Sequence, residues 1–126
     1  LVRTILGVDD DAETLTFAGD IPEGYLAQLM RANFERLIDG AGQAALMTRR
    51  DGQADDRAAL VLAISCVGRR LVLGERVEEE LEAARDALPR GATQIGFYSY
   101  GELSPTTSGR CDLHNQTMTL TTIGET

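Results

Sequence analysis

Hydrogen-bonding side chains are concentrated in one short stretch of the chain, GFYSYGELSPTTSGRCDLHNQTM, which covers residues 96–118. This stretch holds the only histidine, His114, one of the two cysteines, Cys111, and the carboxylate Glu102. Imidazole, thiol, carboxylate and amide groups bind polar ligands, hold metal ions and activate nucleophiles. A stretch of this composition is therefore a candidate ligand, metal or catalytic site.

Three predicted strands position these side chains. Residues 58–65 and 93–100 are predicted strands, and a helical segment separates them. A strand, a helix and a strand make a crossover unit, so the two strands are predicted to be parallel. The run AALVLAIS is continuously apolar, which predicts a central strand buried on both faces. The last strand, residues 117–124, is expected to pair with residues 93–100 in a C-terminal antiparallel hairpin.

This topology gathers the polar side chains at one edge of the sheet. Parallel strands end on the same edge, and an antiparallel last strand starts there. The residues expected to meet at this edge are Cys66, Glu102, His114, Asn115 and Gln116. Open α/β sheets bind ligands outside the carboxyl ends of their strands, so this edge is the predicted binding site.

The segment SCVGRR follows the first of these strands and adds positive charge to the same corner. The start of a helix exposes unpaired backbone N–H groups, and Gly68 allows a group to approach the backbone closely. With Arg69 and Arg70 beside it, the corner suits an anion such as a carboxylate. The alternative for each arginine is an ion pair with the nearby glutamates.

The rest of the chain supplies helices and a second hairpin. VRTILGV and TLTFA are predicted hairpin strands around the polar turn DDDAE, which lacks the spacing of a calcium loop. Apolar residues recur at helical spacing from Tyr25 to Ile38, and Gly40 and Gly42 are predicted to stop that helix. Residues 44–48 fit either a strand or a helix, and RRDGQADD is a predicted exposed loop.

The helix before Pro89 has a predicted apolar face and a predicted acidic face. Its predicted inner face consists of Val77, Leu81, Ala84 and Leu88, and the run EEELE is interpreted as a solvated face. Together the elements predict one α/β (α+β) domain over residues 1–126. It is expected to have a single mixed β-sheet with helices packed on it, one βαβ crossover and a C-terminal antiparallel hairpin.

Composition excludes several classes of protein. The net charge of −8 and the pI of about 4.5 argue against a nucleic-acid surface, which needs clustered Lys and Arg. No apolar run is long enough to span a bilayer, and the two cysteines form no disulfide framework, so a cytoplasmic protein is expected. The chain begins LVRTI without an initiator Met, and we expect it to be a piece of a larger protein.

Three motifs, ISCVGRRLVLG, GFYSYGELSP and LHNQTMTLT, resemble the C-terminal domain of the FIST family, the F-box and intracellular signal transduction proteins. The resemblance is strongest over residues 58–125. It implies a non-enzymatic sensory domain of a multidomain bacterial signalling protein, with small ligands such as amino acids. The implied partners are an N-terminal FIST domain and signalling output domains, and no cofactor is implied.

The resemblance also implies which residues form the site. The family positions carried onto this chain are Cys66, Gly68, Arg69, Gly96, Phe97, Tyr98, Gly101, Glu102, His114, Asn115 and Gln116. In a ligand-binding sensor, Arg69 and the helix N-terminus would hold a carboxylate, and Glu102 would hold an ammonium group. Tyr98, Asn115 and Gln116 would fix the ligand's orientation.

Other interpretations of the same residues remain open. Cys66, with His114 as base, could serve a cysteine hydrolase. Cys111 and His114 in CDLH supply half of a zinc pattern, which Cys66 and Glu102 would have to complete. A structural explanation is that His114, Asn115 and Gln116 cap the loop ELSPTTSGRCD through its backbone groups. The last possibility is a structural module for protein interaction.

Overall fold

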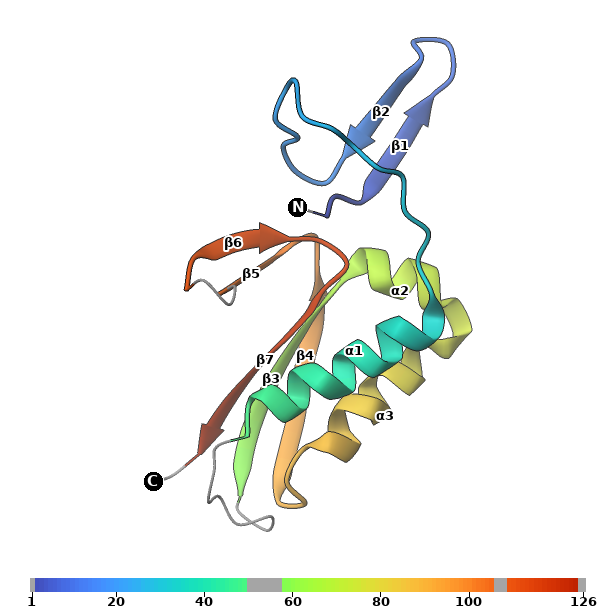
Figure 1. The fold of residues 1–126 in the computed structure, drawn as a ribbon. Helices are drawn as coiled ribbons and strands as arrows, with labels where there is room; N and C mark the ends of the chain where they lie inside the picture. The colour runs from blue at the N-terminus through green and yellow to red at the C-terminus, as the bar shows by residue number, and fades with distance from the viewer. Residues whose placement is uncertain (1, 50–57, 106–108, 125–126) are drawn as a thin grey trace.

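The centre of the molecule is a three-stranded mixed sheet with strand order β4-β3-β7 (Figure 1). The computed structural model describes residues 2–49, 58–105 and 109–124. Strand β3 (Ala59–Cys66) is parallel to β4 (Ala92–Ser99) and antiparallel to β7 (Met118–Gly124). The α+β class, the βαβ crossover and the central place of β3 are therefore confirmed.

The C-terminal strands pair differently from the prediction. Strand β7 joins β3 rather than β4, and the hairpin forms instead between β5 (Glu102–Pro105) and β6 (Cys111–His114). Both edges of β3 accept partners, and the backbone N–H of Cys66 extends the β3–β7 ladder by donating to the Thr117 carbonyl at 3.0 Å. The predicted single sheet is thus a mixed sheet accompanied by two separate hairpins.

The N-terminal hairpin forms as predicted from strands β1 (Ile5–Asp9) and β2 (Thr14–Phe17). Its acidic turn is closed by the Asp9 side chain, whose Oδ1 accepts from the N–H of Ala12 at 2.9 Å. The hairpin projects from one end of the molecule, and a long non-helical segment leads from it to the first helix (Figure 1).

Helix α1 (Phe34–Met47) starts later and runs further than predicted. The Asn33 side chain caps it by accepting from the N–H of Arg36 at 3.1 Å, so residues 25–33 are not helical. The predicted stop at Gly40 and Gly42 is wrong. A Cβ on Gly42 would lie 3.3 Å from the carbonyl oxygen of Ala83, so this glycine lets α1 pack closely against the helix that contains Ala83. Residues 44–47 are helical, and most of RRDGQADD lies outside the described residues.

The crossover is broken into three pieces: α2 (Val67–Leu73), the 3-10 turn η1 (Gly74–Arg76) and α3 (Val77–Ala87). Gly74 has a φ of 56°, which lets the chain turn between α2 and α3. The inner side of α3 carries Glu80 and Ala84, followed by Leu88, whereas Leu81 is partly exposed. The predicted inner face is therefore wrong for Leu81, and EEELE is not a solvated face throughout because Glu80 is buried.

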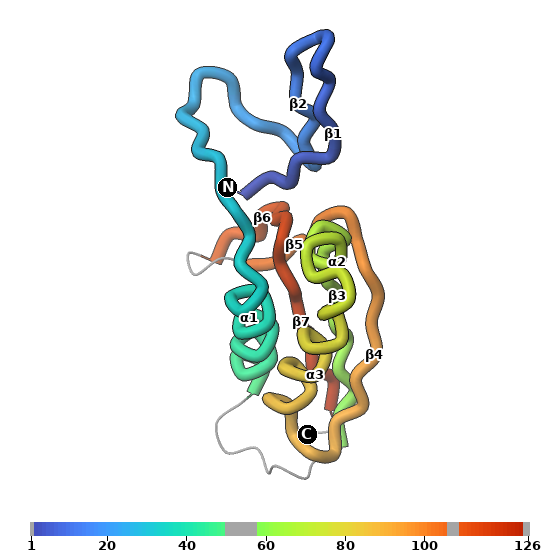
Figure 2. Tube along the Cα trace, turned by 90° about the vertical axis from the view of Figure 1, so that its right-hand side faces the viewer, coloured from blue at the N-terminus to red at the C-terminus, as the bar shows by residue number. Residues whose placement is uncertain are grey.

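Helices α1 and α3 pack side by side over one face of the sheet (Figure 2). The core between them is small: Ala41 and Ala45 from α1, Ala84 and Leu88 from the α3 region, and Val61, Ala63 and Met118 from the sheet. On the opposite face Leu60, Ile95, Phe97 and Ile123 remain 39–59% exposed. The prediction that β3 is buried on both faces is therefore wrong for one face. In the described part of the chain, no helix has the length and apolar character needed to cross a membrane.

Candidate functional site

The chain brings three of its segments together at one edge of the sheet, where β3 and β4 end. Cys66 lies at the end of β3 and is hydrogen-bonded to Thr117. Glu102 in β5 is the direct pairing partner of His114 in β6. Asn115 and Gln116 complete the tight turn between β6 and β7. The edge on which the sequence places these five residues is therefore a real meeting point of the chain, and we call it the rim.

Glu102 is a buried carboxylate in the rim, with only 2% of its surface exposed. Its two oxygens each accept from a hydroxyl: Oε1 from Ser99 Oγ at 2.6 Å and Oε2 from Thr117 Oγ1 at 2.7 Å. No basic side chain among the described residues forms an ion pair with it. A carboxylate removed from water without a cation is costly, because hydroxyl dipoles replace only part of its hydration.

Asn115 holds chain segments in place. It is buried, its Oδ1 accepts from the backbone N–H of Thr4 at 3.2 Å, and its Nδ2 donates to the carbonyls of Tyr100 and His114 at 3.4 and 3.2 Å. These bonds tie the N-terminal segment and the end of β4 to the β6–β7 turn. They match the structural explanation of this residue, since its amide is engaged by backbone groups.

Two glycines, Gly68 and Gly101, lie in close contact with side chains of β6 and of the β6–β7 turn. Gln116 adopts a left-handed φ of 60°, and its Nε2 donates to Thr4 Oγ1 at 3.3 Å. A Cβ on Gly68 would overlap the Gln116 amide, so the group that approaches Gly68 closely is the protein's own side chain. A Cβ on Gly101 would lie 2.8 Å from Leu113 Cδ1. These glycines therefore make room for the β6–β7 turn.

Arg69 points into the protein and is buried. Its Nε donates to Glu80 Oε2 at 2.6 Å in an ion pair whose two side chains are 5% and 0% exposed. The other guanidinium nitrogens donate to the carbonyls of Leu37 at 2.5 Å and Gln116 at 3.3 Å. Ser65 Oγ donates to the second Glu80 oxygen at 2.7 Å. Of the two alternatives for Arg69, the structure shows the ion pair with a nearby glutamate.

Tyr98 lies in β4 beneath the exposed Arg70, whose guanidinium carbon is 5.2 Å from the ring centroid. The Tyr98 hydroxyl is buried and has no hydrogen-bond partner. Two more buried atoms of the predicted site are also unpaired, His114 Nε2 and Gln116 Oε1. Unpaired buried polar atoms are uncommon in native proteins, so the rim retains hydrogen-bonding capacity that the protein does not use.

The buried hydroxyl of Tyr98 predicts a loss of stability at high pH. Burial raises the pKa of Tyr98, and the Glu80 charge adds to this, whereas Arg70 and Arg69 oppose it. A raised pKa disfavours the phenolate in the folded state. The stability is therefore complete below the ordinary pKa of about 10 and falls as the pH rises through the higher folded value, by at most about 1.4 kcal/mol per pH unit. Urea unfolding from pH 8 to 11 will show this fall.

Two phenylalanine variants test that dependence. Tyr98→Phe will weaken the fall above pH 10, and at pH 7 it will not destabilise the protein because the lost hydroxyl has no partner. Tyr100→Phe, at an exposed position, will leave the pH profile unchanged. Identical pH profiles for the parent and Tyr98→Phe would contradict the assignment.

Both cysteines are free thiols in different settings. Cys66 is buried at the junction of β3 and α2, whereas Cys111 is exposed in β6. The hydrolase interpretation would need a thiol that a substrate can reach, and the burial of Cys66 does not favour it. Over residues 2–49, 58–105 and 109–124, no three His, Cys, Asp or Glu side chains are grouped as a metal ion requires.

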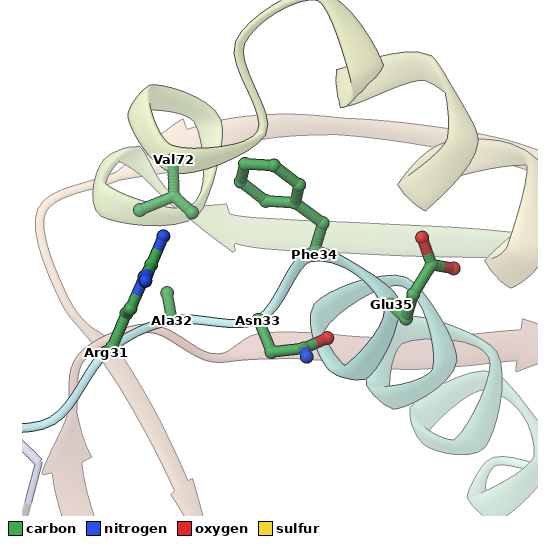
Figure 3. A pocket seen from close by; sticks show the side chains of 6 residues that line it. All are labelled: Arg31, Ala32, Asn33, Phe34, Glu35 and Val72. Atoms are coloured by element: carbon green, nitrogen blue, oxygen red, sulfur yellow. The ribbon is translucent and has the colours of Figure 1, made fainter.

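A cavity of about 680 Å³ lies away from the rim, beside the start of α1 (Figure 3). It is lined by Arg31, Ala32, Asn33, Phe34, Glu35 and Val72. Arg31 and Phe34 point toward α2, where Val72 lies (Figure 3). No sequence pattern indicated this cavity, because most of its lining residues fit the predicted continuous helix over Tyr25–Ile38.

An ion-pair cluster borders this cavity. Arg76 lies over the Phe34 ring at 5.6 Å and pairs with Glu35 and Glu79 at 2.8 and 2.7 Å. The hydrogen bond from Arg76 lowers the pKa of Glu79. These charges are solvent-exposed and already paired with one another, so Arg76, Glu35 and Glu79 are weak candidates for holding a ligand.

The comparison with protein families now identifies the chain's relatives. The family model of the FIST C domain matches residues 1–105. The chain belongs to the FIST C domain family. No curated protein and no solved structure gives a significant match. Membership places the chain among signal-transduction sensory domains.

The matched range of the FIST C domain includes the N-terminal hairpin, α1, the crossover, β4 and β5. It contains Cys66, Gly68, Arg69, Tyr98, Gly101 and Glu102 of the predicted site, and it ends before His114, Asn115 and Gln116. Sequence reasoning did not find Ser99 and Thr117, which hold Glu102. The only indication in the sequence was that Ser99 and Thr117 lie in the two predicted strands on either side of the loop ELSPTTSGRCD.

Proposed function

We propose that this FIST C domain is a non-enzymatic sensory domain that binds a small ligand carrying a charged amine at the rim. Amino acids are the ligand class that the family resemblance implies, and a ligand amine is the part of that hypothesis with the best structural support. The proposal includes a cytoplasmic, multidomain signalling protein in which an N-terminal FIST domain and output domains are the partners.

The single observation behind this proposal is the buried Glu102 carboxylate. Ser99 and Thr117 donate one hydroxyl each to it, and the described residues supply no cation. A ligand ammonium group would offset the cost of the buried charge and would be selected over neutral analogues, because only a cation satisfies the carboxylate. His114, whose Nε2 is unpaired, is the pairing partner of Glu102 and could contact the same ligand.

Arg69 has no part in the proposed recognition, since its guanidinium is committed to Glu80 and two backbone carbonyls. The ligand's carboxylate, where it has one, would therefore lie toward solvent. The proposed site therefore binds only the ammonium group of an amino acid through a buried charge, and not its carboxylate. A simple alkylamine is predicted to retain measurable binding.

A thermal-shift titration tests the proposal directly. The probes are the L-amino acids and methylamine, and a ligand at one hundred times its Kd adds about 2.7 kcal/mol to the free energy of unfolding, which raises the Tm by several degrees. Glu102→Gln keeps the shape but removes the charge, and its Nε2 donates to one hydroxyl instead of accepting from it, so it will abolish the shift. Glu82→Gln, at an exposed position in α3, is the matched control and will retain it.

Two outcomes would contradict the proposal. The first is that none of the amino acids or methylamine stabilises the protein. The second is a ligand that stabilises the parent and Glu102→Gln equally, which would place the ligand elsewhere, for example in the cavity beside Phe34.

A further inference from the structure

One unexplained feature is the non-helical segment between β2 and α1, residues 18–33, which we call the arm. Its apolar side chains Tyr25, Leu26, Leu29 and Met30 are 75–104% exposed. They follow one another at helical spacing, and the run YLAQLMRA consists almost entirely of good helix formers. The arm therefore has an amphipathic helix pattern without a surface to pack against, a combination typical of segments that become helical on docking.

A second unexplained feature is the open face of the sheet. Register places Leu60, Ile95, Phe97 and Ile123 together on the face opposite α1 and α3, with Leu62 and Ile64 between them. The remaining positions of the three strands on this face are Thr93, Thr119, Thr121, Cys66 and Ser99, so none of these strands places a charged side chain on it. In doubly wound α/β folds helices cover both faces of the sheet, whereas here the described residues place helices on one face only.

The total exposed area of the chain is large for its mass. The chain exposes 9303 Å², whereas a compact monomer of 13.6 kDa exposes about 6,600 Å². The excess of about 2,700 Å² per chain is larger than the roughly 800 Å² that each partner of a standard interface buries. Exposed apolar side chains are grouped on the arm, on the open face and on the β1–β2 hairpin.

We propose that two copies of this chain form a dimer in which the arm of each covers the open sheet face of the other. On docking, residues 22–32 form a helix that supplies the absent layer. Such a helix would be about 16 Å long, and an eight-residue strand is about 26 Å long, so the helix fits within the sheet.

A second copy is the occupant that the apolar surfaces favour. Each copy carries a net charge of −8, which would oppose association through an acidic surface. The open face is neutral and apolar, so its own side chains add no charge repulsion where the arm of the other copy would lie. The arm supplies a matching apolar stripe, and each copy therefore carries both halves of the same contact, as a two-fold symmetric dimer requires.

Sedimentation equilibrium and far-UV circular dichroism of this chain test the proposal. The parent will be a dimer at micromolar concentration, and its helix content will fall on dilution as the arm is released. The arm variant Leu26→Asp/Leu29→Asp and the face variant Phe97→Lys will each raise the dissociation constant at least tenfold. Leu71→Asp, at an exposed apolar position of α2 outside both surfaces, is the control and will leave the constant unchanged.

Mixing the two variants separates a reciprocal dimer from other arrangements. An intact arm from the face variant can still cover the intact face of the arm variant, so the mixture will dimerise more tightly than either variant alone. Thermal unfolding will verify that each variant is folded. A parent chain that stays monomeric at 100 µM, a dimer insensitive to both variants, or a mixture without recovery would overturn the proposal.

Discussion

Replacing Arg69 with Met will lower the free energy of unfolding by about 3–5 kcal/mol, because it leaves the buried Glu80 carboxylate without its cation. The substitution also removes the hydrogen bonds from the guanidinium group to the part-buried carbonyls of Leu37 and Gln116. A domain of this size has only about 5–15 kcal/mol in total, so the variant will be close to unfolding at 37 °C. Urea unfolding followed by circular dichroism measures the change.

The double variant Arg69→Met/Glu80→Leu tests whether the unpaired Glu80 charge causes the loss of stability. It removes both charges and fills the space with apolar groups, so it will be more stable than Arg69→Met alone. Arg76→Met, which breaks the exposed pairs with Glu35 and Glu79, will change stability little. If Arg69→Met costs no more than Arg76→Met, or if the double variant is less stable than Arg69→Met, the buried pair does not have the role assigned to it.

The Arg69–Glu80 pair matters for the rim although it touches no proposed ligand. It joins α2 to α3, Ser65 joins it to β3, and the carbonyl contacts extend it to α1 and to the turn at Gln116. The planar guanidinium group holds five donors in a rigid fork, whereas the lysine ammonium is a compact point charge on a flexible stem, so lysine would not replace arginine here. We therefore interpret Arg69 as a positioning residue that fixes the β6–β7 turn.

The parts of the fold that sequence could predict are those with a strong local pattern. The apolar run at residues 59–66, the helical segment after it and the strand at 92–99 specify a crossover, and the crossover fixes parallel pairing. The position of the rim was predictable from the sequence for this reason, because the direction of the strands decides which strand ends lie at the same edge of the sheet.

The start of α1 was not predictable because two helical patterns run together. Residues 25–30 and 34–38 share one apolar periodicity, and Asn33 in the middle of it is both an acceptable helix residue and a cap. Tertiary packing separates them: α1 has α3 to pack against, and the arm is exposed. The prediction that the glycines end the helix was wrong because of packing as well. Gly42 lies inside α1 and allows close contact with Ala83.

The partners of individual polar groups were also beyond the sequence. Arg69 and Arg70 are adjacent and chemically identical, but helix geometry turns the first into the core and leaves the second over Tyr98. Similarly, Glu80 is one of several neighbouring glutamates, and only its place on the inner side of α3 makes it the buried one. Which residue of a like pair faces inward depends on the exact helix phase, and the break at Gly74 shifts that phase.

Gly96→Ala will destabilise the protein by at least about 3 kcal/mol, because strand β4 has no room for a side chain at this position. A Cβ on Gly96 would overlap the carbonyl oxygen of Ala63, its direct partner in the β3–β4 ladder. The clash is with backbone rather than with a flexible side chain, so relief requires the two strands to separate at the centre of the sheet. Chemical unfolding will show a lower midpoint, and Tyr98 and Ser99, which follow in the same strand, will be displaced.

Gly40→Ala is the matched control, and its expected effect has the opposite sign. Gly40 lies inside α1 with open space around the position of a Cβ, so alanine will stabilise the helix by about 0.5–1 kcal/mol. The same chemical change therefore separates a glycine needed for backbone contact from one that is merely tolerated. If Gly96→Ala were as stable as the parent, β3 and β4 would have to be further apart than the register of Ala63 and Gly96 allows, and the rim at their ends would have a different shape.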